Sequence, residues 1–277
     1  MIPLDNLEKC STHLDEHAAR YLSPREFEEY TAISGSERSR QVRALLERPI
    51  AHFTIINEVY FRARWAEALR AVHPQQGLVL LEVASGDADM IPQMMARDFP
   101  HSRYLAANTN QKLTASLRTK TRAIPVDVAV IEGDAVAVGR HLAPESVDVV
   151  AFQHGVNDVL QAILCDQAGV DTTHADWMAT LPRMIELVRR EIDRNTFEQN
   201  LKPAFLALLE QLLKVLKPGG LIVMNHYMFQ LDLDWGYPPA LWENLIPIVR
   251  TWTKDIPVYR EASVEGFAPQ WWLFLKK

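Results

Sequence analysis

The sequence has few cysteines, no long apolar run and no excess of basic residues. Its 277 residues include only Cys10 and Cys165, too few for a disulfide framework or a cysteine-rich zinc site, so both are expected to be reduced thiols. No window approaches the ~18 apolar residues of a membrane span, and the first residues lack the basic and apolar regions of a signal peptide. We therefore expect a cytoplasmic protein with no membrane partner.

Charge and composition exclude further classes. The formal net charge is −6, whereas a protein that binds phosphate backbones usually carries an excess of lysine and arginine, so nucleic acid is not an expected partner. Hydrophobic residues make up 48% of the chain, and its glycines and prolines are scattered, which argues against disorder and against a linker. One large domain with appended elements is expected.

Two regions differ in the spacing of their apolar residues. From residue 4 to about 72 the spacing is three and four, typical of helices, and Ser23 before Pro24 and Glu26 resembles a helix start. Residues 1–76 are therefore predicted to form an N-terminal helical cap. From Gly77 onward, short apolar strand-like runs alternate with helical stretches. These runs cover 77–86, 103–109, 126–134, 147–153 and 220–226, followed by VYREASV and QWWLFLKK at the end.

This alternation predicts an α/β fold with a Rossmann-like, doubly wound sheet of seven strands in residues 77–277. The sheet should be mostly parallel, with a C-terminal antiparallel hairpin because no helix separates the last two strands. Roughly residues 166–200 are too long for an ordinary loop between a strand and a helix. They should hold a helical insertion, with its helix starting near Asp176 or Pro182, over the ligand crevice.

The loop after the first strand reads Glu82-Val83-Ala84-Ser85-Gly86-Asp87-Ala88. Its spacing matches the glycine-rich fingerprint of nucleotide-binding α/β folds, but only the middle glycine is retained. A buried turn without a ligand would fit this loop about as well. Three later segments, YLAANTNQKLTASLR, VIEGDAVAV and LLKVLKPGGLIVMNH, follow in a set order.

With these four motifs the chain resembles the class I S-adenosylmethionine-dependent methyltransferases over about residues 77–277, apart from the insertion. The resemblance implies S-adenosyl-L-methionine as cofactor and S-adenosyl-L-homocysteine as product. It places Glu82 near the methionine moiety, Asn108 or Thr109 at the ribose and Asp134 at the adenine amino group. Asn108 lies 20 positions after Ala88, where the family usually has an acidic residue, so its ribose contact would lack charge assistance. The implied cofactor-binding set is Glu82, Ala84, Ser85, Gly86, Asn108, Thr109, Gly133, Asp134, Ala135 and Gln153.

In this family the methyl acceptor lies near the end of the fourth strand, here FQHGVNDVL. His154, Asp158 and, after the fifth strand, His226 are the candidate catalytic residues. A histidine suits proton removal at neutral pH, although contact with the cofactor or a purely structural role fits His154 equally well. No metal is expected, because Asp158, Asn225 and His226 lack the carboxylate cluster of a hard-cation site.

Aromatic residues gather in the cap, in the insertion and after the fifth strand, the elements expected to roof the acceptor. The predicted substrate-binding residues are Tyr60, Asn157, Trp177, Tyr227 and Trp235. Such a lining would suit a small, partly aromatic molecule or a cation stacked on rings. Whether the N-terminal helices form a lid or a homodimer interface stays open.

The function predicted is methyl transfer to a nitrogen or oxygen atom, or else a carbon atom, of a small metabolite or natural-product intermediate. Two alternatives remain. The same cofactor could serve a reaction other than methyl transfer, or the chain could be a non-catalytic binding module in which Ala84, Ala88 and Asn108 mark erosion of the site.

Overall fold

A mixed seven-stranded sheet forms the centre of the molecule. The computed structural model describes residues 5–46, 49–51, 53–73 and 77–277, and within these the side chains from residue 13 onward except that of residue 46. The strand order is β3-β2-β1-β4-β5-β7-β6. The strands are β1 (Val79–Val83), β2 (Arg103–Asn108), β3 (Asp127–Glu132), β4 (Val147–Gln153), β5 (Leu216–Asn225), β6 (Arg260–Glu261) and β7 (Trp272–Lys276).

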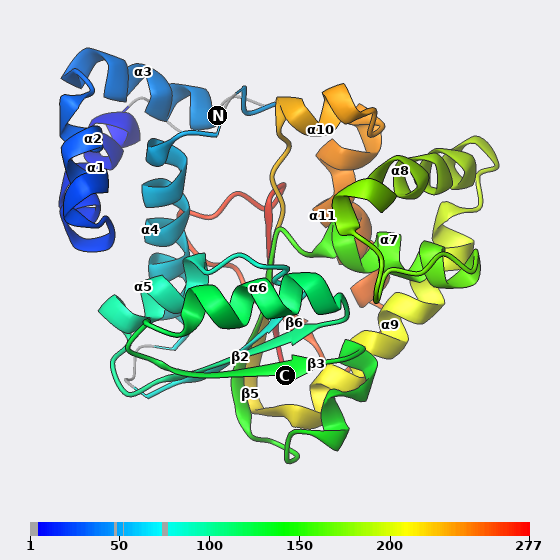
Figure 1. The fold of residues 1–277 in the computed structure, drawn as a ribbon. Coiled ribbons are helices and arrows are strands. Elements are labelled where there is room, and N and C mark those ends of the chain that lie inside the picture. The colour runs from blue at the N-terminus through cyan, green and yellow to red at the C-terminus, as the bar shows by residue number, and fades with distance from the viewer. Residues whose placement is uncertain (1–4, 47–48, 52, 74–76) are drawn as a thin grey trace.

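Strands β1 to β5 run parallel, and β7 pairs antiparallel with both β5 and β6. Helices cover both faces of this sheet (Figure 1). The predicted α/β fold, with its mostly parallel seven-stranded sheet and C-terminal antiparallel pair, is therefore confirmed.

The N-terminal helices and the first two crossover helices share one face of the sheet. They are α1 (Asp5–Tyr21), α2 (Pro24–Ala32), α3 (Gly35–Leu46), α4 (Ile55–Val72), α5 (Met90–Asp98) and α6 (Gln111–Thr121). Alternate strand residues such as Leu80 and Ala106 pack against this layer. The helix start expected at Ser23 is present as a capping box, in which the Ser23 hydroxyl and the Glu26 carboxylate each accept a backbone N–H.

The opposite face carries η1 (Ala135–Arg140), α7 (Val156–Gln167), α8 (Trp177–Asp193), α9 (Phe197–Val215), α10 (Gln230–Trp235) and α11 (Pro239–Thr253). Neighbouring strand residues, including Leu81 and Leu105, point into this second core. The free thiol of Cys165 is buried there, whereas the Cys10 side chain lies outside the described residues. Because β1 to β5 run parallel, their carboxyl ends form one edge of the sheet.

Of the two starts expected for the helix in the insertion, the structure has the one at Asp176: helix α8 begins after Asp176, whose carboxylate caps it. Two other segments differ from the sequence-based expectation. Helix α9 begins at Phe197, inside the insertion expected to extend to about residue 200, and it accommodates Pro203. Helices α10 and α11 were not predicted, and Pro238, Pro239 and Pro247 obscure the helical pattern there.

The Pro218-Gly219-Gly220 turn lies inside β5. Pairing with β4 passes from Val147↔Leu216 directly to Val149↔Leu221, so the residues between Leu216 and Leu221 bulge out of the ladder. Gly219 takes a positive φ of 77° within this bulge. The glycines therefore re-align the strand after α9 has already ended at Leu216.

Candidate functional site

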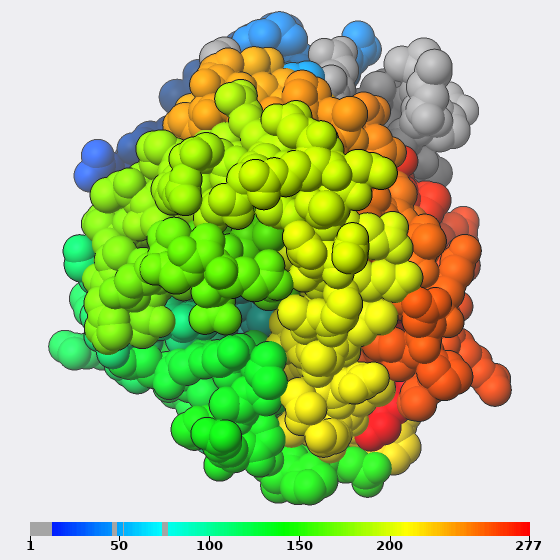
Figure 2. All heavy atoms as spheres, turned by 90° about the vertical axis from the view of Figure 1, so that its right-hand side faces the viewer, coloured from blue at the N-terminus to red at the C-terminus, as the bar shows by residue number. Residues whose placement is uncertain are grey.

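A cavity of about 580 Å³ opens at the carboxyl ends of β1, β2 and β3. It lies beside the point where the strand order reverses between β1 and β4, the usual ligand crevice of open α/β sheets. Figure 2 shows a hollow in this face of the molecule between the green segments and the yellow α9. Its volume is in the range of small-molecule sites.

The lining combines the ends of strands with residues of several helices. These are the first turn of α6, the start of η1, much of α7, the first residue of α8 and two residues within α9, and the segment between α7 and α8 contributes as well. It comprises Val83, Ala84, Gly86, Ala107, Asn108, Thr109, Asn110, Gln111, Leu113, Glu132, Gly133, Asp134, Ala135, Val136, Asp158, Val159, Ala162, Ile163, Asp166, Gln167, Thr172, Thr173, Trp177, Ala204 and Leu208. No described residue of α1–α4 is among them, so the N-terminal helices do not roof this cavity.

The loop after β1 is held in a strained conformation. Ala84, at the position where the fingerprint has its first glycine, has a φ of 57°, a left-handed conformation that is costly for any residue with a Cβ. Gly155, at the start of α7, packs directly on it. A Cβ at Gly155 would lie 2.8 Å from the Val83 carbonyl oxygen and 3.2 Å from that of Ala84. The ends of β1 and β4 can therefore lie this close only because position 155 is a glycine, which the sequence analysis did not single out.

Asn108 ties the end of β2 to this loop. Its Oδ1 accepts the Ser85 hydroxyl and the Gly86 N–H, each at 3.1 Å, and its Nδ2 donates to the Gly86 carbonyl at 2.6 Å. An asparagine amide has two N–H donors, so one remains for a ligand in the cavity. Asn108 thus both shapes the loop and lines the cavity.

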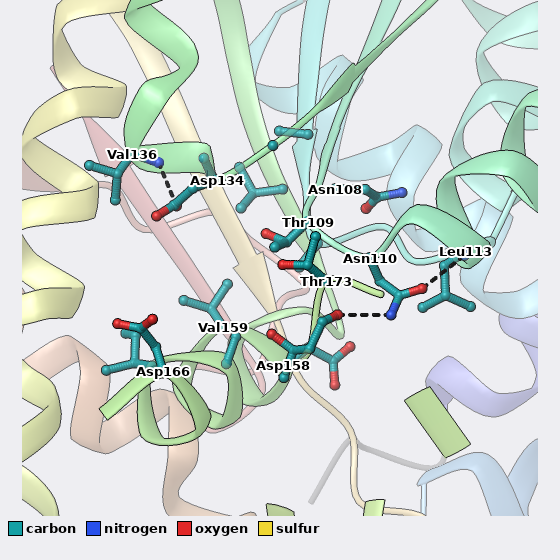
Figure 3. Close-up of a pocket in the computed structure, with 18 of the residues that line it drawn as sticks. Asn108, Thr109, Asn110, Leu113, Asp134, Val136, Asp158, Val159, Asp166 and Thr173 are labelled. Carbon is teal, nitrogen blue, oxygen red and sulfur yellow. Dashed lines mark hydrogen bonds between the residues drawn. The ribbon is translucent and has the colours of Figure 1, made fainter. Parts of the chain in front are cut away.

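The turn after β3 forms another side of the cavity. Gly133 N–H donates to the Asn108 carbonyl at 2.9 Å, and the Asp134 Oδ1 accepts the Val136 N–H at 2.9 Å. The Asp134 side chain is exposed at the cavity mouth (Figure 3). Thr109 and Ala135 lie beside it on the lining.

The strap, residues 168–176 between α7 and α8, crosses toward the start of α6. Asn110 Nδ2 donates to the carbonyls of Thr172 (2.8 Å) and Ala175 (2.9 Å), and the Gln111 N–H donates to that of Thr173 (2.9 Å). The Asn110 Oδ1 also accepts the Leu113 N–H, which caps α6 (Figure 3). One side chain therefore caps a helix and fastens the strap over the cavity.

The ionisable side chains on the lining are all acidic. They are Glu132, Asp134, Asp158 and Asp166, and the lining contains no lysine, arginine or histidine. The start of α5 is also acidic, with Asp89 at the N-cap, so this helix end does not form the open anion site of a phosphate-binding loop. The cavity should therefore favour a cationic ligand over a phosphate.

Asp158, in the first turn of α7, faces this cavity. Its Oδ1 accepts the Asn157 amide N–H at 2.9 Å. Burial, with a smaller contribution from the negative charge of Asp232, raises the pKa of Asp158 from 3.8 to about 7. A carboxyl group with such a pKa can take up and release a proton near neutral pH.

His154 and His226 form a stacked pair at the ends of β4 and β5, with ring centroids 4.6 Å apart. Burial lowers the pKa of His154 to about 4, so its imidazole is neutral at pH 7. Its Nδ1 accepts the Tyr227 N–H at 3.2 Å, which leaves the proton on Nε2. In this arrangement Nε2 of His154 is a hydrogen-bond donor. Neither histidine is part of the cavity lining.

Three predicted cofactor-binding residues lie behind the lining. Glu82 points to the opposite face of the sheet, where its carboxylate accepts the Tyr104 hydroxyl at 2.7 Å, and burial raises its pKa to about 8. Ser85 is buried against Asn108. Gln153 accepts the indole N–H of Trp65 at 2.9 Å. The other seven line the cavity: Ala84, Gly86, Asn108, Thr109, Gly133, Asp134 and Ala135.

The predicted substrate-binding residues are dispersed. Trp177 lines the cavity at the start of α8, and Asn157 is buried next to Asp158. Tyr60 and Tyr227 are buried around Phe61 in the core of the other face. Trp235 is exposed at the end of α10.

The lining residues that sequence reasoning missed come mainly from the start of α6, from α7 and α9, and from the strap. Asn110 precedes α6 as an N-cap, a signal that the sequence carries. Thr172 and Thr173 carry no comparable signal, because their place on the lining depends on how the strap crosses, and Asp166 reaches the lining from the last turn of α7. Within the described part of the chain, no three histidine, cysteine or acidic side chains are grouped to hold a metal ion. No helix there is long and apolar enough to cross a membrane.

Comparisons with known proteins match only solved structures. No family model matches the sequence, and no curated protein matches it. A SAM-dependent methyltransferase from Aquifex aeolicus is similar at 13% identity, over 81% of this chain and 98% of that one, with a TM-score of 0.46. The CurJ carbon methyltransferase is also similar, at 13% identity, 100% and 71% coverage and a TM-score of 0.45. The [4+2]-cyclase SpnF shares 16% identity over 58% and 43%, with a TM-score of 0.34. Each of these is a likeness of fold alone.

Proposed function

We propose that this protein is an S-adenosylmethionine-dependent methyltransferase that acts on a nitrogen or oxygen atom, or else a carbon atom, of a small molecule. The observation that carries the proposal is the acidic cavity at the switch point of the sheet. A nucleotide that carries phosphates would meet Asp134, Asp158 and Asp166 with no basic side chain on the lining, and Glu132, which pairs with Arg118 at 2.8 Å, would add no positive charge there. An adenosyl sulfonium has the opposite charge and suits such a lining.

The residues present fit this cofactor. Asp134 would accept the adenine amino group, the remaining N–H of Asn108 would reach the ribose, and the loop at Ala84 and Gly86 would lie along the methionine moiety. Gly133 supports this arrangement, since a Cβ there would meet no atom within 4 Å and the turn leaves open space. When bound, the cofactor would supply an activated methyl group.

The chain's own contribution would be positioning and proton transfer. Methyl transfer needs an in-line acceptor that carries a lone pair. Asp158 is the candidate for removing the acceptor's proton, because it faces the cavity and its pKa is about 7. The strap would exclude water from above, and the acidic charge favours a small acceptor over nucleic acid.

The test is calorimetric titration with S-adenosylmethionine and S-adenosylhomocysteine. Asp134→Ala should weaken binding by about 1 to 3 kcal/mol, the usual cost of losing one partner of a polar contact that the bound ligand would bury. Asp134→Asn keeps an acceptor oxygen and the η1 cap, so it should bind more tightly than the alanine variant. Asp127→Ala, at the exposed start of β3, is the matched control and should bind like wild type. If neither ligand gives heat with the wild-type protein, the proposal is rejected.

A further inference from the structure

Hydrogen bonds of Tyr237 connect the helices that carry two carboxylates, Asp158 on the cavity lining and the buried Asp232 behind it. Asp158 lies in the first turn of α7, and Gln161, one turn later, accepts the Tyr237 hydroxyl at 2.6 Å. The Tyr237 N–H in turn donates to the Asp232 carbonyl at 3.0 Å. Asp232 is buried in α10, and its carboxylate accepts the Phe229 N–H at 3.0 Å. Helices α7 and α10 thus bring these carboxylates together from distant parts of the sequence.

Neither carboxylate forms an ion pair with a described lysine, arginine or histidine. Withdrawing a carboxylate from water is costly unless a positive charge or several hydrogen bonds compensate it. Consistent with this, burial raises the pKa of Asp232 to about 6 and, together with Asp232, that of Asp158 to about 7. Two such groups side by side form a place where a cation would be stabilised.

A third acceptor lies next to Asp158. The Asn157 amide donates to Asp158, but its own Oδ1 is buried without a hydrogen-bond partner, in a residue that is only 8% exposed. Buried polar atoms are normally paired. The two carboxylates and this carbonyl all accept hydrogen bonds, so a ligand that satisfies them must donate several.

We propose that the methyl acceptor is a small primary or secondary amine, bound as its ammonium ion by Asp158, Asp232 and the Asn157 carbonyl. This inference rests on the proposed function and names its substrate class. An ammonium ion supplies the positive charge and the two or three N–H donors that this group of acceptors requires. A carboxylate or phosphate acceptor would be repelled, and a neutral alcohol would leave the charges uncompensated.

The reaction balances with the groups present. The Asp158 carboxylate takes one proton from the bound ammonium ion, which frees the nitrogen lone pair. The nitrogen then forms a bond to the methyl carbon as the bond between that carbon and sulfur breaks, and its electron pair stays on sulfur. The product is a methylated ammonium ion and a neutral thioether, and the proton held on Asp158 passes to water.

The acceptor test pairs amines with alcohols of matched shape. Phenethylamine, tryptamine and putrescine would be compared with 2-phenylethanol, tryptophol and 1,4-butanediol, using methyl-labelled cofactor and mass detection. Each compound is also tested for thermal stabilisation of the S-adenosylhomocysteine complex. We expect label or stabilisation with at least one amine and with none of the alcohols. Methylation of an alcohol, or neither effect with any amine, overturns the inference.

Variants separate ammonium recognition from folding and from cofactor binding. Asp158→Asn and Asp232→Asn should each raise the KM for the best amine by about thirtyfold or more, the usual cost of removing one partner from a buried charge pair. Both should keep S-adenosylhomocysteine binding and have a higher melting temperature, because an uncompensated charge is removed. Asp234→Asn, on the exposed side of α10, is the control and should change neither property.

The possible failures differ from one another. If S-adenosylhomocysteine does not bind the wild-type protein, the proposed function itself fails. If S-adenosylhomocysteine binds but the carboxylate variants have the same KM for the amine as the wild type, only the amine assignment fails.

Discussion

The alanine at position 84 occupies a backbone conformation that glycine adopts without strain. Its φ of 57° costs about 1 to 2 kcal/mol for a residue with a Cβ. Ala84→Gly should remove this cost. The glycine also gives the unfolded chain more conformational freedom, which lowers the free energy of unfolding by about 0.4 to 1 kcal/mol. We expect a net rise of about 0.5 to 1 kcal/mol in the free energy of unfolding, measured by urea titration.

Ala88→Gly tests the same loop without the strain, since Ala88 is not in the left-handed region. This control should lower the free energy of unfolding by up to about 1 kcal/mol through unfolded-state entropy alone. Equal effects from the two variants would contradict the assignment of strain to Ala84.

Also at the residue scale, Asp158 makes stability depend on pH. Because its pKa is raised to about 7, the folded protein holds a proton that the unfolded chain has already released. The stability that this bound proton adds to the folded state is fully present below about pH 4. It is lost as the pH rises through 7 and stays lost above it. Asp158→Asn should therefore raise the free energy of unfolding at about pH 8 by roughly 1 to 3 kcal/mol.

The measurement is urea unfolding at about pH 5 and about pH 8, where the gain from Asp158→Asn should be larger at the higher pH. A gain that is equal at both values would show that lost charge is not its cause. The exposed Asp234→Asn variant should stay within about 0.5 kcal/mol of wild type.

At the scale of elements, one side chain links the cap of α6 to the strap. Asn110→Asp keeps an acceptor for the Leu113 N–H, and aspartate caps helices as well as asparagine does. The carboxylate cannot donate to the carbonyls of Thr172 and Ala175, and it would repel them. We expect α6 to remain stable while the amides of residues 168–176 exchange with solvent at least about tenfold faster, since each lost hydrogen bond contributes about 1 kcal/mol.

Hydrogen exchange followed by mass spectrometry resolves the two segments. Faster exchange in α6 as well as in the strap would mean that the aspartate had failed as a cap. Unchanged exchange in the strap would show that Asn110 does not fasten it.

The sequence predicts elements well where apolar spacing and turn residues agree. The five parallel strands and the terminal pair follow from buried runs, and the Asp176 cap marks the start of α8. Helices α10 and α11 could not be predicted because prolines interrupt their pattern. Seven of the predicted cofactor-binding residues line the cavity because they lie at or just after the ends of parallel strands. The topology of the sheet places those ends at one edge. The surroundings of Asp158 depend on α10 and Tyr237, more than 70 positions away, which local patterns do not encode.

At the scale of the whole molecule, the distribution of charge predicts which ligand binds more tightly. The lining has four acidic side chains and no basic one, while S-adenosylmethionine carries one more positive charge than S-adenosylhomocysteine. We expect the methylated form to bind more tightly by about 1 to 2 kcal/mol, the Coulomb energy of one charge several ångströms from a carboxylate at intermediate dielectric. Calorimetry of both ligands at low and high salt measures this difference.

Asp158→Asn should reduce the preference for S-adenosylmethionine over S-adenosylhomocysteine. Added salt should weaken the binding of the cationic ligand more than that of the neutral one. Tighter binding of S-adenosylhomocysteine at every salt concentration would contradict the electrostatic account.

The acidic lining also bears on turnover. Once the methyl group has left, the sulfur is neutral and the cavity loses its attraction for the remaining thioether. The spent ligand therefore dissociates more readily than its precursor does. An enzyme built this way would show weak product inhibition and would keep working where the spent form accumulates, because the chemical step itself removes the charge that held the ligand in place.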